Sequence, residues 1–273
     1  MTRFAGSSVL ITGAAQGMGK LFAQMAAERG AARLVLWDVQ PVTLELTASD
    51  LRARFHSTQV QSQVVDVSNL ENLLSCAQEV GPVDILLNNA GIIVGKLFID
   101  HLPAEIDRTM TINALALMHL THALLPQMIA RRRGHIVNMA STAGLVANPR
   151  MSVYCASKWA VIGWSESLLL EMRSGRTGVN ITTVMPYYIK TGMFVGVRTS
   201  PFLPMMEPEA AASAVIRAVE NNRPRLLMPW QMNLLPFFKG ILPASFFDYL
   251  VGRVLSVYSG METFTGRQTQ GRS

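Results

Sequence analysis

The stretch "SSVLITGAAQGMG" at residues 7–19 joins a short apolar run to three closely spaced glycines. Such a run is typical of a buried strand, and the segment that follows has the pattern of a helix. The absent side chains at Gly13, Gly17 and Gly19 let the backbone approach a pyrophosphate, which the amides of a helix N-terminus bind. The spacing is GxxxGxG rather than GxGxxG, so this turn needs support from the rest of the chain.

Apolar runs of the same kind alternate with helix-like segments along the sequence. The strand candidates are residues 7–12, 32–38, 60–67, 83–89, 134–140, 179–185 and 224–228. The helix candidates are residues 17–29, 41–54, 69–80, 103–132, 152–174 and 207–222, and Gly30, Gly81, Gly134 and Gly175 are expected to end four of them. Continuous apolar strands alternating with helices predict an α/β fold with a doubly wound parallel sheet, buried on both faces.

Length and composition set broad limits. The chain has 273 residues, of which 49% are hydrophobic and 15% charged, with a mean hydropathy of +0.26. These values exclude a disordered chain and favour one domain over residues 1–273. The composition changes after about residue 195, where Pro, Phe and Met accumulate, and residues 192–260 are expected to form a substrate-cleft lid and an apolar C-terminal extension.

Charge and cysteine content narrow the class of protein. The net charge is +6, but no aromatic residues interleave with the basic run "ARRRG" at 130–134, so nucleic-acid binding is not expected. That run suits a helix C-terminus. Cys76 and Cys155 form no metal-binding or disulfide pattern, which favours a reducing compartment. With no signal peptide or N-terminal membrane anchor expected either, we expect a cytoplasmic protein.

Asp38 ends the second strand candidate, about where a dinucleotide fold places a carboxylate on the adenosine ribose. A carboxylate there repels the extra phosphate of NADP, and Gln16, Val39 and Gln40 supply no cation to attract it. NAD is therefore preferred over NADP, although Asp38 also fits a helix N-cap. Asp66, followed by Val67, is placed to contact adenine, with a plain turn aspartate as the alternative.

Three further segments place polar groups near strand ends or inside helices. "LLNNAG" at 86–91 follows the fourth strand candidate and "MAS" at 139–141 follows the fifth, where open α/β sheets bind their ligands. Asn113 interrupts a long helical pattern, and the simplest reason is a side-chain hydrogen bond that bends the helix.

The segment "SVYCASK" at 152–158 places Tyr154 and Lys158 four residues apart, on one face of a helix. A free tyrosine has a pKa of ~10, and a nearby ammonium together with a positive nicotinamide ring would stabilise its phenolate. The pair would then carry protons at neutral pH. Taken alone, this spacing is common on helices. Its combination with the glycine turn, "NNAG" and Ser141 earlier in the chain favours a functional pair.

These motifs together resemble the short-chain dehydrogenase/reductase family over essentially the whole chain. The resemblance implies a Rossmann-type fold with a seven-stranded parallel sheet and NAD(P)-dependent oxidoreduction of an alcohol or carbonyl. It implies that Tyr154 is the general acid/base and that Ser141 orients the substrate oxygen. It further implies that Lys158 holds the nicotinamide ribose while lowering the pKa of the phenol, and that Asn113 holds a water behind Lys158.

The resemblance also implies a set of cofactor contacts. They are Gly13, Gln16, Gly17, Met18, Gly19, Asp38, Asp66, Val67, Asn89, Ala90, Gly91, Tyr154, Lys158, Ile189 and Thr191. One departure stands out, because the family usually has Pro-Gly where this chain has Pro186-Tyr187. We expect the tyrosine to reroute the loop and narrow the pocket. The long helices correspond to those that pair between subunits in the family, which implies a homodimer or homotetramer.

Finer features resemble the branch that contains retinol dehydrogenases and 17β-hydroxysteroid dehydrogenases. The expected activity is therefore NAD-dependent interconversion of a hydrophobic steroid, retinoid or long-chain alcohol and its carbonyl. The alternatives are an NADPH-dependent 3-oxoacyl or polyketide-type ketoreductase and a non-catalytic NAD-binding scaffold. Relatives in this branch usually carry an N-terminal anchor. Here the aromatic segment 230–258 fits either a lid or subunit contact, or short helices in peripheral contact with a membrane.

Overall fold

The computed structural model describes residues 1–201, 203–254 and 257–266, with no side-chain description for Val254. Part of the predicted lid and extension, namely Phe202, Leu255 and Ser256, lies outside the described residues. The same holds for residues 267–273 of the predicted domain.

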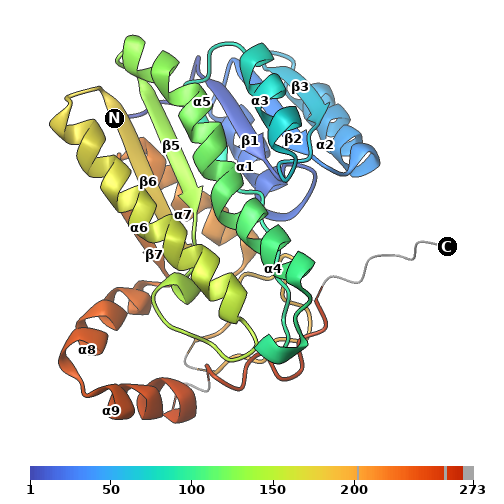
Figure 1. Cartoon of the computed structure of the whole chain (residues 1–273). Coiled ribbons are helices and arrows are strands. Elements are labelled where there is room, and N and C mark those ends of the chain that lie inside the picture. Colours follow the sequence, from blue (N-terminus) through green and yellow to red (C-terminus); the bar gives the residue numbers. More distant parts are fainter. Residues whose placement is uncertain (202, 255–256, 267–273) are drawn as a thin grey trace.

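Seven parallel strands form one sheet in the order β3-β2-β1-β4-β5-β6-β7 (Figure 1). The strands are β1 Ser8–Thr12, β2 Arg33–Asp38, β3 Gln59–Val64, β4 Ile85–Asn88, β5 Gly134–Met139, β6 Val179–Pro186 and β7 Arg225–Met228. The order reverses beside β1, so the cleft between β1 and β4 opens at their carboxyl ends. The predicted doubly wound sheet is confirmed.

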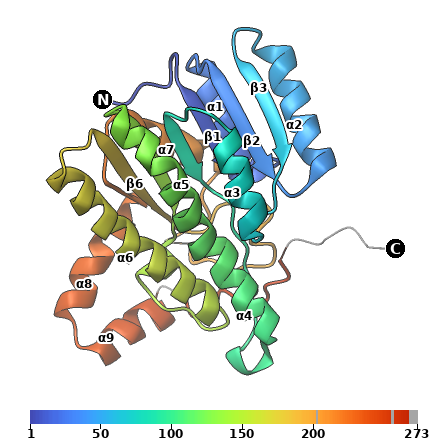
Figure 2. The same cartoon turned by 45° about the horizontal axis from the view of Figure 1, so that its top comes forward.

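Helices cover both faces of the sheet. They are α1 Gly17–Glu28, α2 Pro41–Arg54, α3 Leu70–Glu79, α4 Pro103–Met110, α5 Ala116–Ala130, α6 Ser152–Ser174 and α7 Pro208–Glu220. One apolar cluster joins α1, α2 and α7 to the sheet through residues such as Phe22, Leu44 and Val215. A second joins α3, α5 and α6 to the opposite face, which is the near face in Figures 1 and 2.

Two expectations about these elements are corrected. The edge strands β3 and β7 are not buried on both faces: only Val60 of β3 and only Met228 of β7 are buried. The helix expected over 103–132 is interrupted by a π-helical turn, Thr111–Leu115, which lies between α4 and α5. Asn113 sits in that turn, and its side chain bonds outside the helix, as described below.

Helix endings show a further difference. Gly30 and Gly81 adopt the expected left-handed conformation, with φ of +75° and +69°. After α5 and α6 that conformation is taken instead by Arg132 (φ 51°) and Arg176 (φ 48°). Gly134 opens β5, where an added Cβ would lie 2.7 Å from the sulfur of Met128, so close packing explains this glycine.

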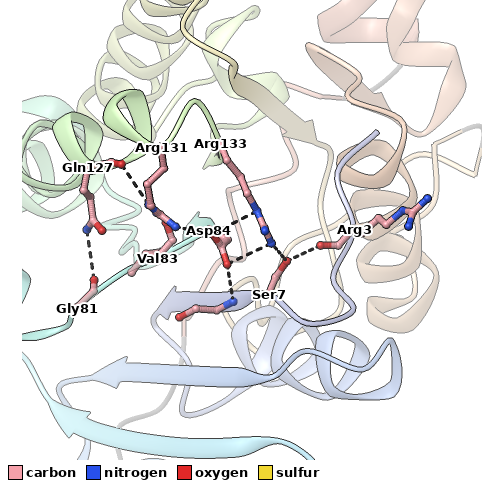
Figure 3. Close-up of polar contacts among 9 residues, drawn as sticks. Arg3, Ser7, Gly81, Val83, Asp84, Gln127, Arg131 and Arg133 are labelled. Carbon is pink, nitrogen blue, oxygen red and sulfur yellow. Dashed lines mark hydrogen bonds and ion pairs between the residues drawn. The ribbon is translucent and has the colours of Figure 1, made fainter.

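The basic run after α5 is bound within the molecule at the amino ends of the strands (Figure 3). Arg131 donates to Asp84 Oδ1 at 2.7 Å and to the Val83 carbonyl at 2.6 Å. Arg133 reaches Asp84 and the Ser7 hydroxyl at 3.5 and 3.3 Å. The Ser8 amide donates to Asp84 Oδ2 at 3.1 Å. These arginines therefore tie the start of β5 to β1 and β4.

The segment after β7 forms short helices that project from the body of the fold (Figures 1 and 2). They are the 3-10 helix Trp230–Leu234, α8 Leu235–Ile241, α9 Ala244–Tyr249 and the wide turn Leu250–Val254. Val251 and Phe247 are buried, whereas Trp230, Phe237, Ile241 and Phe246 are exposed. Every helix in the described part of the chain is too short or too polar to span a bilayer.

Candidate active site

A cavity of about 250 Å³ lies at the carboxyl ends of the central strands. Most of the predicted cofactor and catalytic residues line it: Gly13, Gln16, Gly17, Met18, Asp38, Val67, Asn89, Ala90, Gly91, Ser141, Tyr154, Lys158, Ile189 and Thr191. Gly19, Asp66 and Asn113 do not line it. The structure thus brings together segments that are far apart in the sequence.

The glycine turn between β1 and α1 has the geometry of a phosphate cradle. Gly13 and Gly17 have φ of +67° and +57°, a backbone conformation that residues with a side chain rarely adopt. An added Cβ at Gly19 would lie 2.0 Å from the Gly13 oxygen, so this glycine permits the helix to pack on the turn. Gln16 begins α1 without any side-chain cap, and the first turn holds no acidic residue. The amides of α1 therefore fit a pyrophosphate.

Asp38 and Asp66 differ in position. Asp38 lies in the cavity wall and accepts hydrogen bonds from the Ala15 and Gln40 amides at 2.9 and 3.0 Å. The N-cap of α2 is Gln40, so Asp38 does not cap that helix. Asp66 is exposed, and its Oδ1 accepts from the amide and hydroxyl of Ser68 at 2.9 and 2.6 Å. These contacts match the plain turn aspartate of the sequence analysis.

The "NNAG" segment ties the ends of β1 and β4 together. The Asn89 amide nitrogen Nδ2 donates to the carbonyls of Thr12 and Gly13 at 3.0 and 3.1 Å. The Ala90 amide donates to the Thr12 hydroxyl at 3.0 Å. These bonds hold the glycine turn against the loop that follows β4, and so shape the floor of the cavity.

Tyr154 and Lys158 lie one turn apart near the start of α6, and both are buried. The Lys158 ammonium donates to the Met139 carbonyl at 2.7 Å and lies 5.6 Å from the centre of the Tyr154 ring. Both side chains line the cavity, so the spacing of four places them together as expected.

Burial dominates the proton affinities of this pair. It raises the pKa of Tyr154 to about 12, a hydrogen bond with Ser141 acts in the opposite direction, and Cys155 raises the pKa further. Burial also lowers the pKa of Lys158 to about 8. The protein by itself therefore keeps the phenol protonated at neutral pH. The acidifying effect expected of Lys158 does not outweigh burial.

Ser141 begins the short 3-10 helix Thr142–Gly144 that follows β5. Its hydroxyl oxygen accepts from the Ala143 amide at 3.1 Å, and the hydroxyl donates to the Pro186 carbonyl at 3.4 Å. Ser141 lines the main cavity together with Tyr154, and its side chain opposes the effect of burial on the pKa of that tyrosine.

Asn113 lies behind this wall. Its Oδ1 accepts from the Ile92 amide at 2.8 Å, and its Nδ2 donates to the Ile92 carbonyl at 2.9 Å and to the Ser157 hydroxyl at 3.1 Å. The side chain thus clamps the loop after β4 against α6. An added Cβ at Gly91 would lie 3.3 Å from Asn113 Oδ1, so the loop passes close to this amide.

A smaller pocket of about 50 Å³ shares Ser141, Tyr187 and Phe194 with the main cavity. Its wall is largely apolar, and the C-terminal extension contributes Met232, Leu235, Val251 and Val257. Tyr187 lines both spaces and packs edge-on against Tyr188, with ring centres 4.7 Å apart. The tyrosine that replaces the usual glycine therefore forms part of the partition between them.

Sequence reasoning did not include several residues that line the main cavity. These are Trp37, Val65, Ile92, Arg108, Ile112, Ala140, Met193 and Phe194. Arg108 matters because it brings a guanidinium into the same wall as Asp38. It comes from α4, far along the chain from the β2 end that the sequence analysis searched for cations.

Comparison with known proteins agrees with this geometry. A profile of the short chain dehydrogenase family matches residues 7–201. Mouse (Mus musculus) epidermal retinol dehydrogenase 2 is 38% identical over 97% of this chain and 87% of its own. The chain therefore belongs to the short chain dehydrogenase family, and it is an NAD(P)-dependent oxidoreductase of alcohols or carbonyls.

Solved structures of relatives share the fold. A short chain dehydrogenase/reductase from Burkholderia phymatum in complex with NAD has a TM-score of 0.79 and 26% identity, covering 88% of this chain and 95% of its own. A short-chain dehydrogenase from Sphingobium yanoikuyae in complex with NADPH has a TM-score of 0.77 and 28% identity, covering 84% and 90%. The solved structures that share this fold thus include complexes with NAD and with NADPH.

Proposed function

We propose that this chain interconverts a hydrophobic alcohol, of steroid, retinoid or long-chain type, and its carbonyl, with NAD as cofactor and Tyr154 as general acid/base. The observation that carries the proposal is the position of Ser141. It lines the main cavity together with Tyr154 and also lines the apolar pocket. An apolar substrate in that pocket would present its oxygen to both hydroxyls.

A nicotinamide dinucleotide, held by the residues of the main cavity, supplies the hydride acceptor or donor when bound. Tyr154 gives its proton to the carbonyl oxygen in reduction and takes the hydroxyl proton in oxidation. Its raised pKa keeps the phenol protonated, which is the form that reduction requires. Ser141 donates a hydrogen bond to the reacting oxygen, and Lys158, held on the Met139 carbonyl, adds positive charge beside the phenol.

The preference for NAD follows from Asp38, whose carboxylate lies in the cavity wall. It would accept hydrogen bonds from ribose hydroxyls and repel a phosphate at that position. Arg108 in the same wall favours the alternative, an NADPH-dependent ketoreductase of the 3-oxoacyl or polyketide type. The test is the affinity of wild type, Asp38→Ala and Arg108→Ala for NAD and NADP. We expect wild type to bind NAD more tightly and Asp38→Ala to lose the preference; tighter NADP binding to wild type would reverse the assignment.

The apolar substrate class is supported by the pocket wall and by the likeness to a retinol dehydrogenase. Val251 lines the pocket and is buried, whereas Phe237 on α8 is exposed. We expect Val251→Asn to raise KM for steroid, retinoid and long-chain alcohols, with Phe237→Asn as the matched control. Equal KM values in the two variants would show that the C-terminal extension does not form part of the substrate site, and would contradict its proposed role as a lid.

We also propose peripheral membrane contact through the same extension. Its exposed side chains include Trp230, Phe237, Ile241, Phe246 and Tyr249. Such side chains on short helices suit the interface of a bilayer. Flotation with anionic and neutral liposomes tests this: wild type should float and Phe237→Glu/Ile241→Glu should not. If the wild-type protein floats with neither kind of liposome, the proposal of membrane contact is wrong, and the lid is the role that remains for the extension.

Self-association is proposed on the outer surface of α5 and α6. Ile129 and Leu170 on these helices are exposed apolar side chains, and Leu115 just before α5 is another. Such side chains are suited to burial between copies of the chain. Analytical ultracentrifugation should give a dimer or tetramer that Leu170→Glu weakens, and a monomeric wild type would refute the proposal.

A further inference from the structure

The apolar pocket contains one amide whose bonding is incomplete. Asn148 lies in the loop between the 3-10 helix Thr142–Gly144 and α6, and only 8% of it is exposed. It lines the pocket together with apolar side chains such as Val146, Leu203 and Val251. A buried amide in such surroundings is expected to have its hydrogen bonds satisfied.

One end of the Asn148 amide is bonded and the other is not. Nδ2 donates to the Tyr188 hydroxyl at 3.0 Å, and that hydroxyl donates to the Met151 sulfur at 3.5 Å. Oδ1 is buried and has no partner among the described residues. Asn113, by contrast, has both amide atoms bonded to protein groups. Both side-chain atoms of Asn113 are thus bonded within the protein, whereas Asn148 has an unused hydrogen-bonding atom.

Rotating the Asn148 side-chain amide by about 180°, which exchanges Oδ1 and Nδ2, still leaves one amide atom without a hydrogen bond. Oδ1 would then accept from the Tyr188 hydroxyl, and Nδ2 would be left without an acceptor. In either orientation one atom of this pocket-lining amide lacks a partner among the described residues. A hydroxyl group satisfies both cases, since it can donate to Oδ1 or accept from Nδ2.

We propose that Asn148, held in place by Tyr188, determines specificity by hydrogen-bonding a second hydroxyl of the substrate. The inference rests on the proposed function, because Ser141 in the same pocket takes the reacting oxygen. The preferred substrate is then a lipophilic diol, such as a steroid with two hydroxyl groups. An apolar alcohol with a single oxygen, such as retinol, leaves the amide unpaired and is a poorer substrate.

The test compares a steroid 3,17-diol with the two mono-alcohols that lack one or the other hydroxyl. The measured quantity is the ratio of kcat/KM for the diol to kcat/KM for the better mono-alcohol. Wild type should favour the diol by about 10- to 100-fold, as expected for a buried polar group that would otherwise stay unpaired. Asn148→Leu keeps a similar volume without the amide and should bring the ratio close to one.

Two further variants separate recognition from packing. Tyr188→Phe removes the hydroxyl that holds the amide, so the ratio should fall between those of wild type and Asn148→Leu. Leu203→Met alters the wall of the same pocket and leaves the hydrogen bonds of Asn148 and Tyr188 in place, so it should change all three kcat/KM values alike and keep the ratio. An unchanged ratio in Asn148→Leu would overturn the inference, because an ordered water would then satisfy the amide.

The outcome is distinct from failure of the proposed function. If wild type converts none of the three alcohols, the assigned activity fails, and ligand-induced thermal shifts with NAD present decide the role of Asn148. A larger increase in Tm with the diol, lost in Asn148→Leu, would support the binding site. Equal increases with the diol and the mono-alcohols, or none, would overturn it.

Discussion

The two ends of the central sheet differ in their polar groups, with an ion-pair cluster at the amino ends and the cavity lined by Tyr154 and Lys158 at the carboxyl ends. At the amino ends of the strands, Arg131, Arg133 and the Ser8 amide share the Asp84 carboxylate (Figure 3). At the carboxyl ends, the amides of α1 face a cavity and the Asn148 Oδ1 and Trp37 indole N–H have no partner among the described residues.

This difference separates stability from chemistry. Polar groups that are paired within the protein contribute to folding, whereas polar groups left open at a cavity are available to a ligand. We therefore expect changes at the carboxyl ends to act mainly on binding and turnover. Changes at the amino ends should act mainly on the free energy of unfolding.

The largest expected effect is that of Tyr154→Phe. Removing the proposed proton donor should lower kcat by ~10³-fold, in the range of general acid–base catalysis. Steady-state kinetics with a hydrophobic alcohol measure the loss, and dinucleotide affinity should stay near that of wild type. A variant that keeps a tenth or more of the activity would show that another group moves the proton.

Gly19→Ala should come next, because its Cβ would lie 2.0 Å from the backbone oxygen of Gly13. The helix must shift, so we expect a loss of about 1–3 kcal/mol in the free energy of unfolding and weaker dinucleotide binding. Gly163→Ala in α6 is the matched control, since an added Cβ there meets no atom within 4 Å. Chemical denaturation of both variants measures the difference, and equal stabilities would contradict the packing role.

The amino end should show a pH effect centred on His135. Burial, with the positive amino terminus as a lesser cause, lowers the pKa of this histidine from 6.5 to about 3. The unfolded chain therefore binds more protons between these two values, and stability should fall as pH falls below 6.5. The slope from this group approaches about 1.4 kcal/mol per pH unit.

Denaturation curves from pH 7 to pH 5 measure this slope. The stabilising contribution should be complete above pH 6.5. His135→Gln should flatten the dependence, whereas His56→Gln, at an exposed site, should leave it unchanged. An unaltered slope in His135→Gln would assign the effect to other groups.

The smallest effect is expected for Asp84→Asn. Its ion pairs with Arg131 and Arg133 are partly exposed, so we expect a loss of about 1–2 kcal/mol in the free energy of unfolding. Asp50→Asn breaks the exposed pair with Arg54 and should cost no more than about 0.5 kcal/mol. The kcat/KM of Asp84→Asn should match that of wild type, and a marked fall would break the proposed separation of the two ends.

Much of the fold was predictable because its signals are local. The apolar runs gave the strands and the expected helices to within a few residues, apart from the interrupted helix around Asn113, whereas the expected burial of β3 and β7 was wrong. Whether a strand lies at the edge of the sheet depends on the order of the strands, which the residues of one strand do not determine. The end of α6 lies where it was expected, with Gly175 as its C-cap, but the left-handed conformation after α5 and α6 falls on Arg132 and Arg176, residues that rarely adopt it.

The candidate site was predictable to a similar extent. Tyr154, Lys158 and Ser141 were found from spacing and motif order, and they do line one cavity. Arg108 and Asn148 were not found, since each reaches its cavity through a loop or helix whose path is set by packing. The proton affinity of Tyr154 also depends on burial, which spacing does not report.

The sequence by itself determined the alternation of strands and helices, the glycine turn and the order of the Ser-Tyr-Lys residues. Each of these depends on a repeat or spacing within a few turns of chain. Only the tertiary structure decided which groups remain unpaired beside a cavity and which are neutralised. Hydrogen bonding and desolvation act through space, between segments such as the β5–α6 loop and the C-terminal extension that lie about a hundred residues apart.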